Sequence, residues 1–223
     1  MTADDQRRRA AIEEMVRHVG RFVRDERVLD AMRVVPRDEF VPPRLRRYAF
    51  EDHALPIGEG QTISQPLIVG MMTEAARLDG HEHVLEVGTG SGYQAAILAR
   101  LARDVVTVEI VATLREHAAA TLARLGVANV TVLPADDELG AAQHGPYDAI
   151  LVTAVAPSLP GSLLAQLRVG GRMVIPVGRH ADDQELLVVS KTPEGIETVS
   201  LGGVRFVPLR GAGGFDDDGA STL

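Results

Sequence analysis

The segment "VLEVGTGSGYQAA", residues 84–96, determines the fold that we predict. An apolar run typical of a buried strand ends at three closely spaced glycines, and an apolar segment of helical pattern follows them. Glycines at such a point permit a tight turn and bring backbone N–H groups close to a ligand, at the start of a helix whose dipole favours negative charge. The segment therefore predicts a strand, a ligand-binding turn and a helix of an open α/β sheet.

From residue 83 onward, short apolar runs alternate with segments of helical pattern. Nearly every position in these runs is apolar, which predicts parallel strands buried on both faces. Two later runs follow without a clear helix between them, so we expect antiparallel strands at one edge. The prediction is a doubly wound, Rossmann-like α/β sheet. The expected strands are HVLEVG (83–88), DVVTVEI (104–110), NVTVLPA (129–135), YDAILVTA (147–154), GRMVIPVG (171–178), QELLVVSKT (184–192) and ETVSLGGVRFVPL (197–209).

The chain before the sheet has a different pattern. Apolar residues near helical spacing in residues 7–33 predict one or two amphipathic helices. Prolines interrupt residues 34–66, which predicts a loop-rich segment, and "GEGQTISQP" (58–66) within it is expected to be a loop. A further helix is expected in residues 65–78 and would lead into the first strand.

Length and composition bound the function. With 223 residues, one domain is the best expectation: N-terminal helices and active-site loop in 1–82, the sheet in 83–210 and a flexible, Gly/Asp-rich tail in 211–223. A formal net charge of −8 argues against a general nucleic-acid binder. The chain has no cysteine, its histidines show no metal spacing, and no apolar run nears the length of a membrane span. We therefore expect no metal, no nucleic-acid or membrane partner, and a cytoplasmic location.

Three acidic residues end successive predicted strands. Glu86 precedes the first glycine by two residues, where it would repel a pyrophosphate and favour a cationic amino-acid group. Glu109 lies about twenty residues beyond the glycines, the usual distance for an acid that binds ribose hydroxyls. Asp136 is placed to accept a hydrogen bond from an adenine amino group. The alternative is that the glycines are only turn residues and that the acids are solvated strand ends. The three acids together favour S-adenosyl-L-methionine as the ligand.

Longer blocks of the sequence resemble one enzyme family. They include "VPRDEFVPPRLRRYAFEDHALPIGEGQTISQP" (35–66), "VLEVGTGSGYQAAILARL" (84–101) and "VRFVPL" (204–209). The chain resembles the protein-L-isoaspartate (D-aspartate) O-methyltransferases from near its start to about residue 210, and "GQTISQP" is the part that other methyltransferases lack. The resemblance implies a class I methyltransferase fold and methyl transfer from S-adenosyl-L-methionine to the α-carboxyl of L-isoaspartyl residues in damaged proteins or peptides. The resulting ester would collapse to a succinimide.

The resemblance also implies roles for individual residues. It places the active-site serine at Ser64, next to residues that line the cofactor. The implied cofactor-binding residues are Gln61, Thr62, Ile63, Glu86, Gly88, Gly90, Gly92, Glu109, Ala135 and Asp136. One position departs from the family, which usually has Gly-Asp-Gly where this chain has Ala135-Asp136-Asp137. Asp137 removes a backbone position free to adopt positive φ and adds charge near the expected adenine, so cofactor affinity is expected to differ.

The loop at residues 58–66 offers two hydroxyls and no base. Because a carboxylate is already ionised at neutral pH, its methylation needs no general base, and a hydroxyl that only donates a hydrogen bond is adequate. Charge is lost as an anion meets a sulfonium, so a loop that excludes water would favour the reaction. The residues alone favour the interpretation of Ser64 as a turn or cap residue before Pro66, and the resemblance to the family reverses that preference.

Two other functions stay open at this point. A biosynthetic relative would methylate a normal aspartate in one peptide partner and give an aspartimide, by the same chemistry. A nucleic-acid methyltransferase or a non-catalytic adenosine-binding module is the other alternative. Against a nucleic-acid methyltransferase, the chain lacks a cysteine nucleophile, and no Asn/Asp-Pro-Pro-aromatic block follows the fourth strand.

Overall fold

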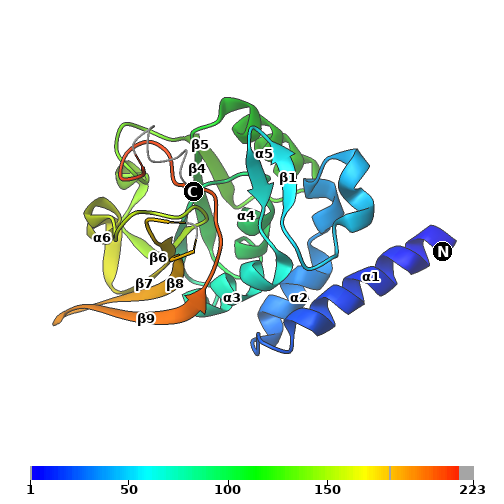
Figure 1. Cartoon of the computed structure of the whole chain (residues 1–223), viewed down its shortest axis with the longest axis horizontal. Coiled ribbons are helices and arrows are strands. Elements are labelled where there is room, and N and C mark those ends of the chain that lie inside the picture. The colour runs from blue at the N-terminus through cyan, green and yellow to red at the C-terminus, as the bar shows by residue number, and fades with distance from the viewer. Residues whose placement is uncertain (1, 181, 216–223) are drawn as a thin grey trace.

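The computed structural model describes residues 2–180 and 182–215, and a seven-stranded sheet runs through it in the order β5-β4-β3-β6-β7-β8-β9 (Figure 1). The first five of these strands pair in parallel and the last two add antiparallel. This confirms the predicted doubly wound sheet with antiparallel edge strands. The strands are β3 (His83–Val87), β4 (Asp104–Glu109), β5 (Val130–Pro134), β6 (Tyr147–Val152), β7 (Leu167–Val177), β8 (Glu185–Thr192) and β9 (Gly195–Gly203).

Both faces of the sheet are covered, as its continuous apolar runs require. Successive side chains of a strand point to opposite faces, and in β3 Val84 joins one hydrophobic cluster while Leu85 and Val87 join another. The first of these clusters includes residues of α3 and α4, and the second includes Leu163 of α6. The helices that follow the N-terminal segment are α3 (Pro66–Ala76), α4 (Tyr93–Leu98), α5 (Ala112–Arg124) and α6 (Gly161–Gln166).

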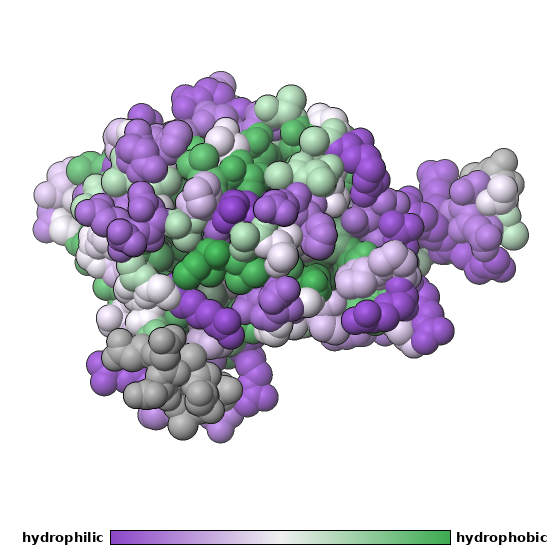
Figure 2. All heavy atoms as spheres, turned by 90° about the horizontal axis from the view of Figure 1, so that it is seen from above, coloured by the Kyte–Doolittle hydropathy of each residue, from purple (hydrophilic) through white to green (hydrophobic). Residues whose placement is uncertain are grey.

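Two helices precede the sheet domain, as the spacing in residues 7–33 predicts: α1 (Ala3–Val19) and α2 (Glu26–Val34). Thr2 and Asp5 form a capping box at the start of α1, which satisfies two backbone N–H groups there. The first half of α1 is exposed and forms a hydrophilic arm that extends from the body of the molecule (Figure 2). The other half buries Met15, Val16 and Val19 in the core, so only this half is held by packing.

The segment 58–66 is more ordered than the loop that its composition predicts. β1 (Leu55–Gly58) and β2 (Gln61–Ile63) form an antiparallel hairpin, preceded by two 3₁₀ helices, η1 (Arg37–Phe40) and η2 (Pro43–Tyr48). In the turn between the strands, φ is positive at Gly58 (104°), Glu59 (54°) and Gly60 (71°). Glycine adopts positive φ without steric cost, so the two glycines favour this turn. Ile63 is buried opposite Leu55, and this contact fixes one end of the segment that carries Ser64.

The last predicted strand, residues 197–209, is also interrupted. β9 ends at Gly203, next to Gly202 with a φ of 111°, and the chain then leaves the sheet. Residues 204–209 cross to the end of β6, where the Val155 N–H donates to the Val207 carbonyl oxygen (2.9 Å) and the Leu209 N–H donates to that of Val155 (2.8 Å). The crossing brings a segment near the C-terminus to the ligand-binding side of the sheet. The flexible tail at 211–223 stays a prediction, and its residues 216–223 lie outside the described part.

Candidate active site

The main pocket lies at the carboxyl edge of the sheet, where β3, β4, β5 and β6 end. Open α/β sheets bind ligands at this edge. All the residues predicted to form the site line the main pocket, with the exception of Gly92: Gln61, Thr62, Ile63, Ser64, Glu86, Gly88, Gly90, Glu109, Ala135 and Asp136. The structure therefore brings together predicted residues from the ends of three strands, β3, β4 and β5, and from the β1–β2 hairpin.

The glycine turn after β3 is held by side chains from neighbouring strands. Gly88 has a φ of 96°, and a Cβ there would lie 2.4 Å from the Thr153 hydroxyl oxygen. That hydroxyl lies 3.1 Å from the Val87 carbonyl oxygen and 2.6 Å from the Gly88 carbonyl oxygen. Position 88 therefore requires glycine both for its backbone conformation and for the close approach of β6.

Gly92 has a different place. It is the N-cap of α4 with a φ of 87°, and a Cβ there would contact Ala118 (3.3 Å) and Leu122 (3.4 Å) of α5. Its lack of a side chain thus serves helix packing. A cofactor contact through the backbone of Gly92 stays a prediction.

Glu86 is fully buried beneath the main pocket, and its two carboxyl oxygens differ in their partners. Thr107 donates to Oε2 (2.5 Å), and the Thr107 hydroxyl also lies 2.7 Å from that of Thr89, whereas Oε1 has no hydrogen-bond partner among the described residues. Burial raises the pKa of Glu86 to about 8, opposed by the Thr107 hydrogen bond and reinforced by the charge of Glu109. A buried acceptor without a partner is costly, and a cationic donor in the pocket would remove that cost. The site therefore fits an ammonium group here.

Glu109 performs a task that the sequence did not predict. Its Oε2 accepts from the Gly90 N–H (2.8 Å) and its Oε1 accepts from the Val111 N–H (3.0 Å), so the carboxylate ties the glycine turn to the end of β4. A carboxylate accepts about four hydrogen bonds, which leaves capacity for two ribose hydroxyls. Loss of Glu109 would thus affect both the turn and a bound ribose.

The third acidic strand end is open to solvent. Asp136 is exposed, and its Oδ1 accepts from the Asp137 N–H (2.8 Å). Asp137 does not adopt positive φ, so the departure from Gly-Asp-Gly costs no backbone strain. The remaining difference from the family pattern is the added charge of Asp137 beside the main pocket.

Ser64 lies where two cavities meet. Thr62, Ser64, Thr153 and Val207 line both the main pocket and a side groove, which also borders Ala54, Gln65, Ile68 and residues 203–206. Within residues 2–180 and 182–215 the Ser64 hydroxyl makes no hydrogen bond. A molecule in the main pocket and another in the side groove would therefore meet at this free hydroxyl.

The β1–β2 hairpin covers the glycine turn. A Cβ at Gly90 would lie 3.5 Å from Ile57 Cδ1 of β1, and the Thr113 hydroxyl of α5 donates to Glu59 at the hairpin tip (3.3 Å). Figure 1 shows β1 beside α5. These contacts place the hairpin where the predicted water-excluding loop would act.

Part of the site comes from distant segments that the sequence did not predict. Leu139, Gly140 and residues 207–212 line the main pocket. Gly140 must be glycine because a Cβ there would lie 2.4 Å from Gln166 Oε1. This requirement could not be predicted from the sequence, because it depends on a contact with a distant residue. In the described part of the chain, no group of three or more histidine or acidic residues is arranged to hold a metal ion, and no helix is long and apolar enough to span a membrane.

The comparison with protein families gives a match along most of the chain. Residues 7–213 match the family described as protein-L-isoaspartate(D-aspartate) O-methyltransferase (PCMT). The chain belongs to this family.

Individual relatives agree with that assignment. The chain is 52% identical to a protein-L-isoaspartate O-methyltransferase 1 of Syntrophobacter fumaroxidans over 198 residues, which span 89% of this chain and 92% of the relative. It is 50% identical to a protein-L-isoaspartate O-methyltransferase of Methanoculleus marisnigri over 220 residues, or 98% and 99% of the two chains.

Solved structures of PCMT proteins share the fold. One protein-L-isoaspartate O-methyltransferase superposes with a TM-score of 0.80 at 29% identity and covers 91% of this chain and 67% of its own. A Plasmodium falciparum structure, described as a beta-aspartate methyltransferase (PCMT) in complex with S-adenosyl-L-homocysteine, gives a TM-score of 0.74 at 23% identity and covers 89% and 95%. At that identity the second likeness bears on the fold alone.

Proposed function

We propose that this PCMT-family chain transfers the methyl group of S-adenosyl-L-methionine to the α-carboxyl of L-isoaspartyl residues in proteins or peptides and so begins their repair through a succinimide. The observation that carries the proposal is the family match over residues 7–213, which includes the segment that presents Ser64 between the main pocket and the side groove. The main pocket would hold the methyl donor and the side groove the acceptor peptide.

The donor would be held by the three acidic strand ends. The free Oε1 of Glu86 would accept from the ammonium of the methionine moiety, and the remaining lone pairs of Glu109 would accept from the ribose hydroxyls. Asp136 would accept from the adenine amino group at the open side of the main pocket. When bound, the cofactor supplies an electrophilic methyl group next to Ser64.

The acceptor reaction is a direct transfer. A carboxylate oxygen of the isoaspartyl residue forms a bond to the methyl carbon, the methyl–sulfur bond breaks, and its electron pair stays on sulfur. An anion and a cation become a neutral ester and a neutral thioether, so exclusion of water by the β1–β2 hairpin favours the step. The Ser64 hydroxyl would donate to the other carboxylate oxygen and hold it in line.

The proposed partners are isoaspartyl-containing proteins or peptides, and the proposed location is the cytoplasm. We propose no nucleic-acid or membrane partner. The biosynthetic alternative, with a normal aspartate in one peptide, is not favoured, because relatives at about 50% identity over most of the chain carry the isoaspartyl name.

Methyl-label transfer to two synthetic peptides tests the proposal. The peptides share one sequence and differ only in an isoaspartyl or an aspartyl linkage. We expect the isoaspartyl peptide alone to take up label from the cofactor. Equal labelling of both peptides, or of the aspartyl peptide alone, would contradict isoaspartyl repair and support the biosynthetic alternative.

A further inference from the structure

Asp52 lines neither the main pocket nor the side groove, yet it contacts the segment that carries Ser64 at two points. Its Oδ2 accepts from the Gln65 side-chain amide (2.7 Å), and its Oδ1 accepts from the Leu67 backbone N–H (2.9 Å). His18 of α1 also contacts Oδ2, with 2.9 Å between Nε2 and Oδ2. One carboxylate thus connects α1, the residue after Ser64 and the first turn of α3.

The contact with Leu67 has a clear physical basis. α3 begins at Pro66, and its N-cap residue Gln65 makes no side-chain capping hydrogen bond. The first-turn N–H groups of a helix need acceptors, and a negative charge near them is favourable. Asp52 supplies both from a segment 15 residues earlier in the chain. α3 is therefore capped from a distance, and its start is fixed to Asp52.

Ser64 is consequently fixed by its two neighbours. On one side, Ile63 is buried opposite Leu55 in the β1–β2 hairpin. On the other side, Gln65 is held by Asp52. The Ser64 hydroxyl has no hydrogen bond within the described residues, so its own side chain does not set its position.

We infer that Asp52 is a positioning residue for the acceptor step: it holds Gln65 and the start of α3 so that the Ser64 hydroxyl stays at the junction of the main pocket and the side groove. The inference rests on the proposed function, because Ser64 acts on the acceptor only if the chain methylates a carboxylate. It adds a residue that touches neither reactant. Misplacement of Ser64 would slow methyl transfer while leaving Glu86 and Glu109 in place.

The test compares two variants that differ in the hydrogen bonds they keep. In D52A, the Gln65 side chain and the Leu67 N–H both lose their acceptor. In D52N, the amide oxygen accepts from the Leu67 N–H, and the NH₂ group donates to Gln65 Oε1 once the Gln65 side-chain amide turns over, so both contacts are kept. D52N therefore removes the charge of Asp52 and keeps its hydrogen bonds.

We expect D52A to lower kcat for an isoaspartyl peptide by about 10-fold or more, since a displacement of about 1 Å can cost about 10²-fold. S-Adenosylhomocysteine affinity, measured by calorimetry, should change less than about twofold. D52N should keep most of the wild-type kcat. The matched control is Asp148→Ala at the opposite edge of the sheet, because Asp148 also accepts one backbone and one side-chain hydrogen bond. That control should keep its kcat.

Hydrogen–deuterium exchange without any substrate gives a second readout. Residues 61–67 should exchange faster in D52A than in the wild type and keep near wild-type protection in D52N. If D52A does not fold, Q65A takes its place in the exchange measurement, because it removes the Asp52–Gln65 hydrogen bond alone, and residues 61–67 should again exchange faster.

Three results would overturn the inference: wild-type kcat and wild-type protection in D52A, equal losses of kcat and cofactor affinity in D52A, or losses in D52N as large as those in D52A. A wild type that fails to methylate the isoaspartyl peptide would instead contradict the proposed function. In that case the exchange measurement still decides whether Asp52 fixes this segment.

Discussion

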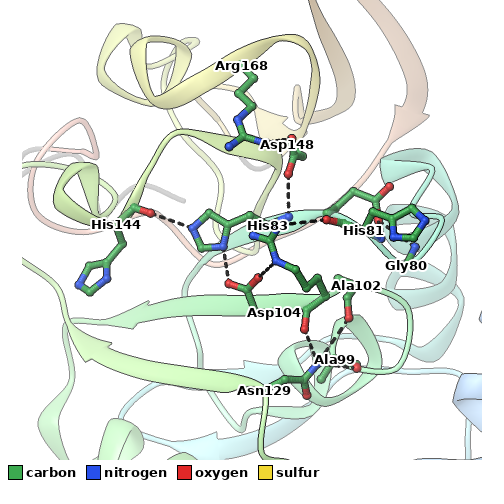
Figure 3. Close-up of polar contacts among 12 residues, drawn as sticks. Gly80, His81, His83, Ala99, Ala102, Asp104, Asn129, His144, Asp148 and Arg168 are labelled. Carbon is green, nitrogen blue, oxygen red and sulfur yellow. Dashed lines mark hydrogen bonds and ion pairs between the residues drawn. The ribbon is translucent and has the colours of Figure 1, made fainter.

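The polar side chains at the two edges of the sheet differ in whether they have hydrogen-bond partners within the protein. At the carboxyl edge, Glu86 is fully buried with one oxygen unpaired among the described residues, and Ser64 has a free hydroxyl. At the amino edge, where the same strands begin, polar side chains pair with one another (Figure 3). Buried polar groups in folded proteins are normally satisfied, so the unpaired group marks the edge that is completed by a ligand.

At the amino edge, polar side chains are satisfied by hydrogen bonds and ion pairs within the protein. The His83 ring contacts the Asp104 carboxylate through Nδ1 and the His144 carbonyl oxygen through Nε2 (2.8 Å; Figure 3). It also stacks on Tyr147 with ring centroids 4.7 Å apart. Asp148 accepts from the His83 backbone N–H (2.8 Å) and from Arg168 (2.5 Å). These residues connect the starts of β3, β4, β6 and β7, so their role is structural.

The largest effect should come from Glu86→Gln, which removes the charge but keeps an acceptor for Thr107. We expect S-adenosylmethionine affinity to fall by about 100-fold, or about 3 kcal/mol, because a buried charged hydrogen bond to the ammonium is lost. Calorimetry at pH 8 measures this. Unchanged affinity would remove Glu86 from the cofactor site.

The same substitution should stabilise the protein without ligand. The folded-state pKa of Glu86 is raised to about 8 by burial, so between the unfolded value of 4.5 and about 8 the folded state keeps a proton that the unfolded state has lost. Stability from this group therefore falls as the pH rises through that window. Glu86→Gln should raise the free energy of unfolding at pH 8 by about 1–3 kcal/mol. Urea denaturation at pH 5 and pH 8 should show the gain mainly at pH 8.

Glu109→Ala comes next, because it removes both ribose acceptors and the tether of Gly90. Loss of charge-assisted hydrogen bonds predicts a decrease in affinity of about 1.5–3 kcal/mol for S-adenosylmethionine and S-adenosylhomocysteine alike. Adenosine serves as a control ligand in the same calorimetry, since it retains the ribose and lacks the amino-acid moiety. A loss confined to the ligands with an amino-acid moiety would contradict the ribose role.

Ser64→Ala tests whether the free hydroxyl acts on the acceptor. Because Ser64 makes no hydrogen bond within the described residues, its removal should leave stability and cofactor affinity nearly unchanged. The rate of methyl transfer to the isoaspartyl peptide should fall by about 10-fold. A full rate would make Ser64 a turn residue before Pro66, which is the interpretation that its sequence context alone favours.

Asp148→Asn should give the reverse outcome at the amino edge. Burial raises the pKa of Asp148, but the hydrogen bonds from His83 and Arg168 outweigh burial and lower the pKa below its ordinary value. The charged form therefore stabilises the fold above about pH 4, and this contribution is lost as the pH falls through the lowered pKa. We expect a loss of about 1 kcal/mol at pH 7 by urea denaturation, with cofactor affinity intact. Lower cofactor affinity in this variant would contradict the conclusion that the amino edge has a structural role and the carboxyl edge binds the ligand.

The sequence predicts the carboxyl edge well where the signal is local. The strand runs, the glycines after β3 and the acids at the strand ends each follow from residues close together in the chain, and the structure places ten of the eleven named residues around one pocket. The tether from Glu109 to Gly90, the crossing of residues 204–209 and the bond from Asp52 to Gln65 depend on contacts between distant segments. Spacing and periodicity carry no information on such contacts.

The smallest expected effect is that of pH on the rate at saturating cofactor, and it separates Glu86 from any catalytic base. Without ligand, Glu86 holds a proton until about pH 8, so cofactor affinity should rise as the pH increases toward that value, by up to about tenfold per unit. The acceptor carboxylate is already ionised, so at saturating cofactor the initial rate of ester formation should stay flat between about pH 6 and 8. Methyl transfer must be measured directly, because succinimide closure itself accelerates with pH. Glu86→Gln should abolish the pH dependence of affinity and leave the flat profile at saturation. A rise at saturation that disappears on replacement of His53, which lies in the N-terminal loop segment, would show that an enzyme base is required and would end the carboxylate-acceptor mechanism.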